Sequence, residues 1–151
     1  MPIWMAVEDE ENIHDVILGI FEVWGIAGIS FVDGAEAISW IDAVDAGNVV
    51  AEMPELAIID IRLPGASGVE VSARLRKSER LCRIPIVLIT AYRFTPQDEI
   101  DVMAQAQADR LIYKPLPAIN DLRKILSGLT HDKENGHRRK KSRDNIGTGQ
   151  G

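Results

Sequence analysis

The sequence predicts an α/β fold in which a five-stranded parallel sheet is covered by helices on both faces. Five apolar runs alternate along the chain with five segments of helical periodicity. Each apolar run is continuous rather than alternating, which is typical of parallel strands buried on both sides. The length of 151 residues and the hydrophobic content of 46% suit one domain with a sizeable core.

The first two strands and the first helix follow from simple patterns. An unbroken apolar run predicts a strand at 3–7. Apolar side chains then recur at helical spacing over 13–24, and Gly25 stands where a left-handed C-cap is favoured. The short apolar run at 29–32 predicts the second strand, and the turn Asp33-Gly34 leads into a second helix.

The rest of the chain continues the same alternation. The expected elements are, in chain order, a loop at 47–55, a strand at 56–60, a helix that begins at Gly68, a strand at 86–90 introduced by Pro85, a weaker helix at 96–106, a strand at 110–113, and an amphipathic helix over 119–129. Beyond Leu129 the periodicity is lost and charged residues, Gly and Asn prevail. The predicted division is therefore a folded domain at 1–127 and a basic, disordered tail at 128–151.

Charge is distributed unevenly along the chain, whose formal net charge is -6. The segment 128–151 holds six Lys or Arg and three acids, so it carries +3 and leaves -9 on the remainder. An acidic domain argues against nucleic acid as the main ligand and favours cations or basic partner surfaces. The basic run at 138–141 either contacts nucleic acid, anionic lipid or an acidic partner, or is simply solvated.

The cysteine content and the hydropathy of the sequence indicate where in the cell the protein is expected. Cys82 is the single cysteine, which excludes an internal disulfide and any zinc site built from several cysteines. No apolar stretch approaches the ~18 residues of a membrane span, and the N-terminus enters a strand-like run directly. We therefore expect a soluble, cytoplasmic protein with no membrane partner.

Polar side chains stand at the ends of the expected strands. Glu8 and Asp9 follow the first strand, Asp60 and Thr90 close the third and fourth, and Lys114 follows the fifth. Right-handed crossovers place these ends at one edge of the sheet, where ligands bind in open α/β folds. Clustered carboxylates repel one another, and a divalent cation such as Mg²⁺ relieves the repulsion. The set suits phosphoryl transfer, with Asp60 as nucleophile and with Lys114 and Thr90 contacting the transferring oxygens.

These residues and their spacing resemble the receiver domain of two-component response regulators. The resemblance extends from about Ile3 to Leu126. Its motifs are Glu8-Asp9-Glu10, Asp33-Gly34-Ala35-Glu36-Ala37, Asp60 followed by Pro64-Gly65 and Gly68, Thr90-Ala91, and Lys114-Pro115. Each motif alone is a weak signal, but their combination in this order and spacing is highly specific.

The resemblance implies a flavodoxin-like sheet of strand order 2-1-3-4-5 and a dependence on Mg²⁺ or Mn²⁺. It implies that Asp60 accepts a phosphoryl group from a partner histidine kinase or histidine phosphotransfer protein. The implied metal ligands are Glu8, Asp9, Asp60 and the backbone carbonyl of Arg62, and a cis peptide is implied before Pro115. Transfer and slow autodephosphorylation would be self-catalysed, so we expect a signalling domain rather than an enzyme.

Two positions depart from the family pattern. The family normally has an aromatic residue three positions before the Lys, which turns inward when the Thr hydroxyl engages the phosphoryl group. Leu111 occupies this switch position, which puts the usual readout in question, while Tyr113 lies on the same face of an ideal strand. Gln107 stands where the family usually has Gly. Two further side chains, Arg62 and Tyr92, occupy modulating positions, and their bulk predicts a long-lived phosphorylated form.

Three function classes remain open at this point. The first is a stand-alone regulator that signals to an unknown protein target by contact or by onward relay, because 128–151 is too short for an output domain. The second is a phosphorylation-independent interaction module, favoured by Leu111 and opposed by Asp60, Thr90 and Lys114. The third is flavin binding, which is disfavoured because the first turn is acidic where a phosphate would need hydroxyls and amides.

Overall fold

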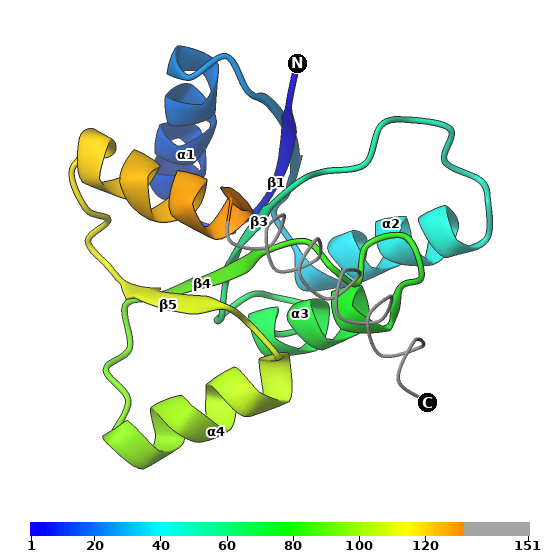
Figure 1. Ribbon diagram of the computed structural model, residues 1–151. Helices are drawn as coiled ribbons and strands as arrows, with labels where there is room; N and C mark the ends of the chain where they lie inside the picture. Colours follow the sequence, from blue (N-terminus) through cyan, green and yellow to red (C-terminus); the bar gives the residue numbers. More distant parts are fainter. Residues whose placement is uncertain (132–151) are drawn as a thin grey trace, which may run out of the picture.

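A computed structural model describes residues 1–131 of the chain (Figure 1). Its five parallel strands form one sheet in the order β2-β1-β3-β4-β5, so the predicted fold class and strand order are confirmed. The elements are β1 (Ile3–Val7), α1 (Glu11–Val23), β2 (Ala27–Phe31), α2 (Gly34–Asp45), β3 (Ala57–Asp60), α3 (Gly68–Lys77), β4 (Ile86–Thr90), α4 (Pro96–Ala106), β5 (Arg110–Tyr113) and a C-terminal helix described over 119–131.

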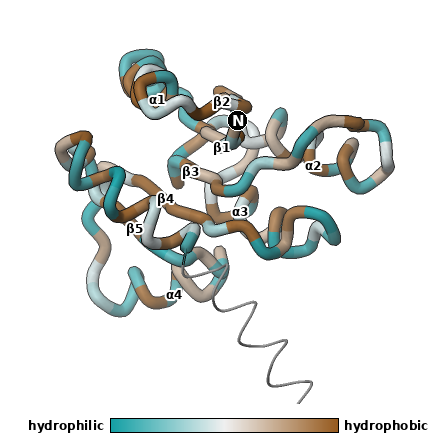
Figure 2. The backbone as a smooth tube through the Cα atoms, turned by 45° about the horizontal axis from the view of Figure 1, so that its top comes forward, coloured by the Kyte–Doolittle hydropathy of each residue, from teal (hydrophilic) through white to brown (hydrophobic). Residues whose placement is uncertain are grey.

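The helices divide between the two faces of the sheet (Figure 1). On one face lie α1 and the C-terminal helix, where Ile17 and Phe21 pack with Leu122 and Leu126. On the other face α3 lies between α2 and α4. Every residue of β4 is buried, and Figure 2 shows the hydrophobic colour along this strand. The continuous apolar runs in the sequence thus correspond to strands covered on both sides.

Most predicted boundaries lie close to those of the structure, and β2 differs most. The strand spans Ala27–Phe31, whereas the apolar run predicted 29–32. Ala27 and Gly28 carry little apolar signal, yet both pair with β1. A Cβ atom at Gly28 would lie 2.8 Å from Cδ2 of Leu18, so α1 packs closely on the strand at this point. This segment was missed because a small residue that permits close packing does not contribute to an apolar pattern.

The C-terminal helix continues to residue 131, so the boundary predicted at 127 falls inside a helix. Beyond that point the predicted tail, including the basic run at 138–141, lies outside the described residues.

Side chains at the helix starts hold the loops around β3. Oδ1 of Asp33 accepts hydrogen bonds from the first turn of α2, and Gly34 N donates to Pro64 O at 2.9 Å, which joins the loop after β3 to the start of α2. Ser67 and Glu70 form a reciprocal capping box at the start of α3. The loop after Asp60 is therefore held at both ends.

Arg76 joins the loops at the opposite end of the sheet. Its guanidinium is almost buried and pairs with Asp109 at 2.9 Å. It also donates to three backbone carbonyls, those of Cys82, Ile84 and Gln107. Gln107 has a left-handed backbone with φ 52°. This conformation costs about 1 kcal/mol for a residue with a Cβ atom, which explains why the family usually has glycine at this position.

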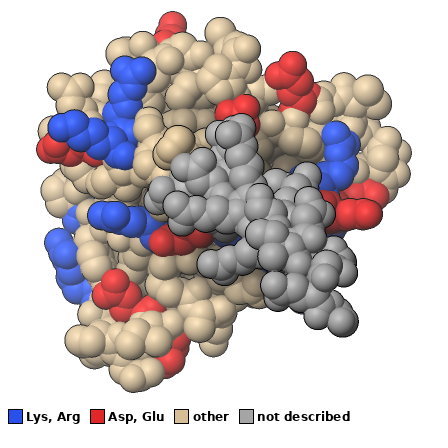
Figure 3. All heavy atoms as spheres, in the orientation of Figure 1, with Lys and Arg blue, Asp and Glu red and all other residues tan. Residues whose placement is uncertain are grey.

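Charged side chains are spread over the surface of the described residues. On the face shown in Figure 3, acidic and basic side chains are interspersed over the described part of the chain. Within residues 1–131, no helix has the length and apolar character needed to cross a bilayer.

Candidate functional site

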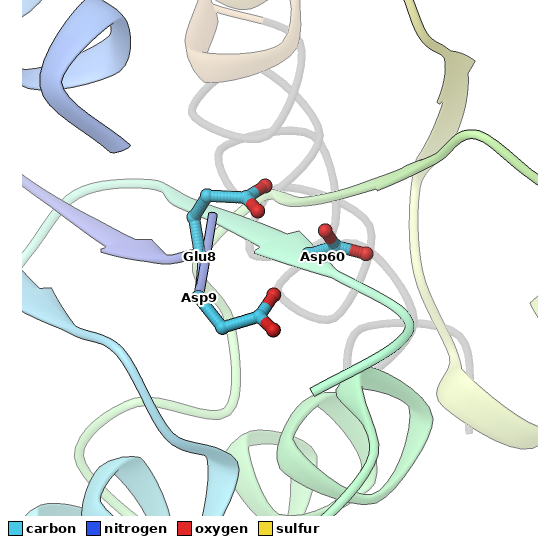
Figure 4. A group of neighbouring side chains, drawn as sticks. All are labelled: Glu8, Asp9 and Asp60. Carbon is cyan, nitrogen blue, oxygen red and sulfur yellow. The ribbon is translucent and has the colours of Figure 1, made fainter. Parts of the chain in front are cut away.

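The sheet brings the predicted polar residues to one edge. Glu8 and Asp9 follow β1, Asp60 ends β3, and Thr90 ends β4, while Lys114 follows β5 directly. Because β1, β3, β4 and β5 are successive neighbours in the sheet, these five residues converge although they are far apart in the sequence. Figure 4 shows the Glu8, Asp9 and Asp60 carboxylates turned toward a shared space at the ends of β1 and β3.

Three carboxylates form the acidic part of the site. Oxygens of Glu8, Asp9 and Asp60 all lie within 4.8 Å of one another. Glu8 is fully buried and Asp60 is 4% exposed, whereas Asp9 lies at the surface. The cluster therefore opens to solvent on the Asp9 side, as a site that takes up ions must.

Lys114 supplies the positive charge. Its Nζ lies 2.7 Å from Oδ2 of Asp60 and 3.1 Å from Oε2 of Glu8. Nζ also lies 3.8 Å from Oε1 of Glu10, an exposed residue that the sequence placed in the acidic motif but not among the metal ligands. Burial alone would lower the pKa of Lys114, but the hydrogen bonds and charges of Asp60 and Glu8 outweigh it and raise the pKa. Lys114 is thus a permanent cation in the cluster.

Glu8 is a buried carboxyl group with a raised pKa. Burial is the main reason that the pKa of its carboxyl group rises from 4.5 to about 7. The hydrogen bond from Glu10 N lowers this pKa, and the neighbouring Asp60 raises it. Oε2 of Glu8 is buried and has no hydrogen-bond partner among the described residues, although Lys114 lies close to it. A bound divalent cation would satisfy this oxygen.

We expect the stability of the metal-free protein to fall as pH rises from about 4.5 to 7. The raised pKa means that folded Glu8 holds its proton where unfolded Glu8 has lost it, so deprotonation disfavours the folded state in this window. The predicted loss is roughly 3 kcal/mol, measured by urea unfolding at several pH values with a chelator present. A Glu8→Gln variant should lose this part of the pH dependence. Equal pH profiles for the two proteins would contradict the assignment.

The backbone on either side of the crevice also contributes. Arg62 N donates to Oδ1 of Asp60 at 3.0 Å, and Tyr92 N donates to Oγ1 of Thr90 at 3.1 Å. The guanidinium of Arg62 lies over the Tyr92 ring, with Cζ 4.6 Å from its centroid. The loops after β3 and β4, which follow Asp60 and Thr90, therefore touch each other. The sequence placed both side chains nearby but gave no sign that they contact each other.

The switch position holds an apolar side chain that packs against the core. Leu111 is partly buried and packs against the core beneath α2, α3 and α4. Tyr113, two residues later, contacts α4 through its hydroxyl, which donates to Glu99 at 3.1 Å. The peptide between Lys114 and Pro115 is cis, as expected from the family pattern.

The donor set fits Mg²⁺ or Mn²⁺. Both ions prefer oxygen ligands, and Mg²⁺ commonly shares its coordination among one or two carboxylates, waters and a phosphate. Glu8, Asp9 and Asp60 supply the carboxylates within the required span, and the buried Glu8 oxygen lacks another partner. The described residues around the cluster offer no thiolate or imidazole that would favour a softer metal.

Comparison with known proteins agrees with this geometry. A family model described as "Response regulator receiver domain" matches residues 5–127. A probable methanogenesis regulatory protein, FilR2 of Methanothrix harundinacea, is 30% identical over 127 residues, which cover 83% of this chain and 79% of that protein. The polar-differentiation response regulator DivK of Brucella ovis is 29% identical over 125 residues, which cover 83% of this chain and 94% of DivK.

Solved structures resemble the whole folded part. A CheY-like receiver domain protein from Methanospirillum hungatei superposes with a TM-score of 0.74 at 22% identity and covers 90% of this chain and 98% of that one. The response regulator TrrA of Thermotoga maritima, solved in complex with Mg²⁺-BeF, has a TM-score of 0.66 at 26% identity and covers 85% and 99% of the two chains.

Proposed function

The chain belongs to the response regulator receiver domain family of two-component signalling, and from this premise we propose that Asp60 accepts a phosphoryl group in a Mg²⁺-dependent reaction. The donor is the phosphohistidine of a histidine kinase or of a histidine phosphotransfer protein. The observation that carries the proposal is the convergence of Lys114 on Asp60 at 2.7 Å, within a cluster of three carboxylates at the sheet edge.

The chain's own residues account for most of the chemistry. An oxygen of Asp60 attacks the phosphorus, a P–O bond forms as the P–N bond breaks, and the electron pair stays on the histidine nitrogen. Lys114 neutralises charge on the transferring oxygens. The Thr90 oxygen already accepts a hydrogen bond from Tyr92 N, and its hydroxyl hydrogen remains able to donate to the phosphoryl group. Water later hydrolyses the acyl phosphate on Asp60. This autodephosphorylation is self-catalysed and slow.

Glu8, Asp9 and Asp60, together with the Arg62 backbone carbonyl, would hold the metal ion. When bound, Mg²⁺ or Mn²⁺ neutralises negative charge that develops on the phosphoryl oxygens. The structure of TrrA with Mg²⁺-BeF supports this choice of ion, because that protein shares the fold and 26% of the aligned residues.

Labelling by acetyl phosphate tests the proposal. We expect a Mg²⁺-dependent mass increase of one phosphoryl group on the peptide that contains Asp60, removed by chelation and absent in Asp60→Asn. Asp33→Asn is a matched control, because it alters an acid that caps α2 and does not belong to the carboxylate cluster. Persistent labelling of Asp60→Asn at the wild-type level would refute the assignment of the phosphoacceptor.

A second candidate function is a phosphorylation-independent interaction module on the same fold. The observation that favours it is Leu111, an aliphatic side chain packed against the core where the family usually has a mobile aromatic ring. The same labelling experiment separates the two functions. A folded protein that remains unlabelled in the presence of Mg²⁺ would favour the interaction module.

The contact between Arg62 and Tyr92 predicts a long-lived phosphorylated form. Arg62 lies over the Tyr92 ring in the loops that follow Asp60 and Thr90, and we infer that the pair reduces the access of water to an acyl phosphate on Asp60. Arg62→Ala and Tyr92→Ala should each speed autodephosphorylation roughly tenfold, which corresponds to about 1.4 kcal/mol in the barrier. The decay of isolated phosphoprotein measures this rate.

Two further variants test whether the pair acts as one unit. The double variant should decay at about the rate of either single variant, because one partner cannot cover the site without the other. Tyr92→Phe keeps the ring beneath the guanidinium and should retain the wild-type lifetime. Rapid decay of the wild-type protein, unchanged in the alanine variants, would contradict this interpretation.

The output is a protein contact or onward relay of the phosphoryl group. The aligned region covers 94% of DivK, so this relative consists almost entirely of a receiver domain. The downstream target is a protein whose surface distinguishes the two states of the domain.

A further inference from the structure

β2 forms an open edge of the sheet. It is the first strand in the order β2-β1-β3-β4-β5, so among the described residues it pairs with β1 alone. Its residues are less buried than those of the inner strands, because Gly28 is exposed and the other four are half-buried. A strand edge with unpaired backbone groups is a template for pairing with a further strand.

The hydrogen bonds to β1 show which backbone groups of β2 point outward. Ala27 N and Phe31 O form hydrogen bonds of 2.9 and 3.1 Å to the residues that flank β1, so both residues face that strand. Alternate residues of a strand face the same neighbour, so Ile29 also faces β1. The N–H and C=O groups of Gly28 and Ser30 therefore point away from the sheet.

The two edges of the sheet differ in the features that oppose pairing with another chain. β5, at the other edge, begins with the exposed Arg110 and is followed by Lys114 and Pro115. Charged side chains and proline are common protections of an edge strand. β2 has the sequence Ala-Gly-Ile-Ser-Phe, with neither a charge nor a proline. Its register with β1 is continuous from Ala27 to Phe31, so no bulge turns it away.

We propose that β2 pairs with β2 of a second copy of this chain, in antiparallel orientation, about a two-fold axis at Ile29. In this register Gly28 of each copy lies opposite Ser30 of the other, and the two residues exchange both of their backbone hydrogen bonds. All the outward N–H and C=O groups of the two strands are then paired. An axis at Gly28 or at Ser30 would leave the groups of the other residue without a partner in β2.

The side chains also fit a second copy. Ile29 lies opposite Ile29, and Ala27 lies opposite Phe31, so apolar groups meet and no like charges face each other within the strands. Gly28, whose Cβ atom would lie 2.8 Å from Cδ2 of Leu18, is on the α1 face of the sheet in both copies. The occupant is a second copy rather than another protein, because the two-fold axis lets one hydrogen-bond pattern serve both partners.

Sedimentation of the unphosphorylated protein tests the pairing. An interface built on one strand is small, so we expect monomer at roughly 10 µM and a growing dimer fraction toward roughly 1 mM. Ser30→Pro removes an outward donor from each copy, and an edge strand tolerates proline where the N–H faces solvent. It should raise the dissociation constant roughly tenfold. Ser30→Ala is the matched control, because it keeps the N–H and should dimerise as the wild type does.

Disulfide crosslinking tests the register. In a Cys82→Ser background, Ile29→Cys places two thiols opposite each other, at the Cα separation of about 4.5 Å that a non-hydrogen-bonded pair has. Oxidised glutathione should convert the two thiols to an intermolecular disulfide, with release of two molecules of reduced glutathione, and a non-reducing gel shows the dimer. Val32→Cys is the matched control, because Val32 is 49% exposed yet would lie about 20 Å from its counterpart.

The outcomes separate this pairing from the proposed phosphoryl acceptance, because Asp60 takes no part in it. A wild-type protein that stays monomeric at roughly 1 mM would overturn the pairing and leave the edge for a strand of another protein. Equal crosslinking of Ile29→Cys and Val32→Cys would also overturn it, since random collisions would then account for the disulfide. Neither result would bear on labelling of Asp60.

Discussion

Replacing Lys114 with methionine is expected to lower the free energy of unfolding of the metal-free protein, at pH 8, by roughly 3 to 5 kcal/mol. Methionine keeps the length and apolar stem of lysine but removes the charge that lies 2.7 Å from Asp60 and 3.1 Å from Glu8. Two almost buried carboxylates are then left without their cation, and such uncompensated charge is strongly destabilising. Urea unfolding with a chelator present measures the loss.

Adding Mg²⁺ shows whether the stability loss in Lys114→Met comes from the missing charge or from a packing defect. Saturating MgCl₂ should restore much of the lost stability in Lys114→Met, because the ion replaces the missing charge and binds the folded state. Lys114→Arg retains a cation and should unfold near the wild-type denaturant concentration. A stability loss in Lys114→Met that is the same with and without Mg²⁺ would show that the lysine acts by packing alone.

Introducing a single methyl group at Gly68 should destabilise the protein by about 3 kcal/mol and slow phosphoryl acceptance by roughly 100-fold. A Cβ atom there would overlap the carbonyl oxygen of Asp60 and lie 2.8 Å from Cα of Ile61. Both obstacles are backbone atoms, so the clash is relieved only if the end of β3 moves. That movement displaces the phosphoacceptor itself. Thermal unfolding and the rate of labelling by acetyl phosphate report the two effects.

Gly19 provides the matched control for Gly68→Ala. It is exposed in the interior of α1, and a Cβ atom built there meets nothing within 4 Å. Gly19→Ala should therefore stabilise the protein by about 0.5 to 1 kcal/mol and leave labelling unchanged, since alanine is the better helix former. The account of β3 would be wrong if Gly68→Ala were as stable as wild type and accepted phosphate at the same rate.

The fold was predictable because its strands are buried on both faces. Continuous apolar runs gave β1, β4 and β5 their correct bounds, and the parallel arrangement then placed Glu8, Asp60 and Lys114 at one edge. The predicted bounds of β2 were wrong because the strand begins with two small residues, Ala27 and Gly28. Gly28 belongs to β2 because α1 packs against it, and an apolar pattern contains no signal for such a contact.

The site was predictable as a set of residues but not as a set of contacts. Strand ends identify Asp60 and Lys114, whereas the stacking of Arg62 on Tyr92 depends on how two loops approach each other. The bond from Tyr113 to Glu99 likewise depends on where α4 lies over β5. Such contacts join elements whose relative placement is set by the whole core, so local sequence patterns do not contain them.

Because of the guanidinium of Arg76, the two ends of the parallel strands differ in what they carry. At one end a single side chain ties α3 to the turns that precede β4 and β5, through three carbonyls and the Asp109 carboxylate. The other end, one strand length away, carries the reactive groups. The contacts of Arg76 therefore lie at the opposite end of the strands from Asp60 and Lys114, so a change in charge at those two residues does not directly alter the contacts that tie α3 to β4 and β5.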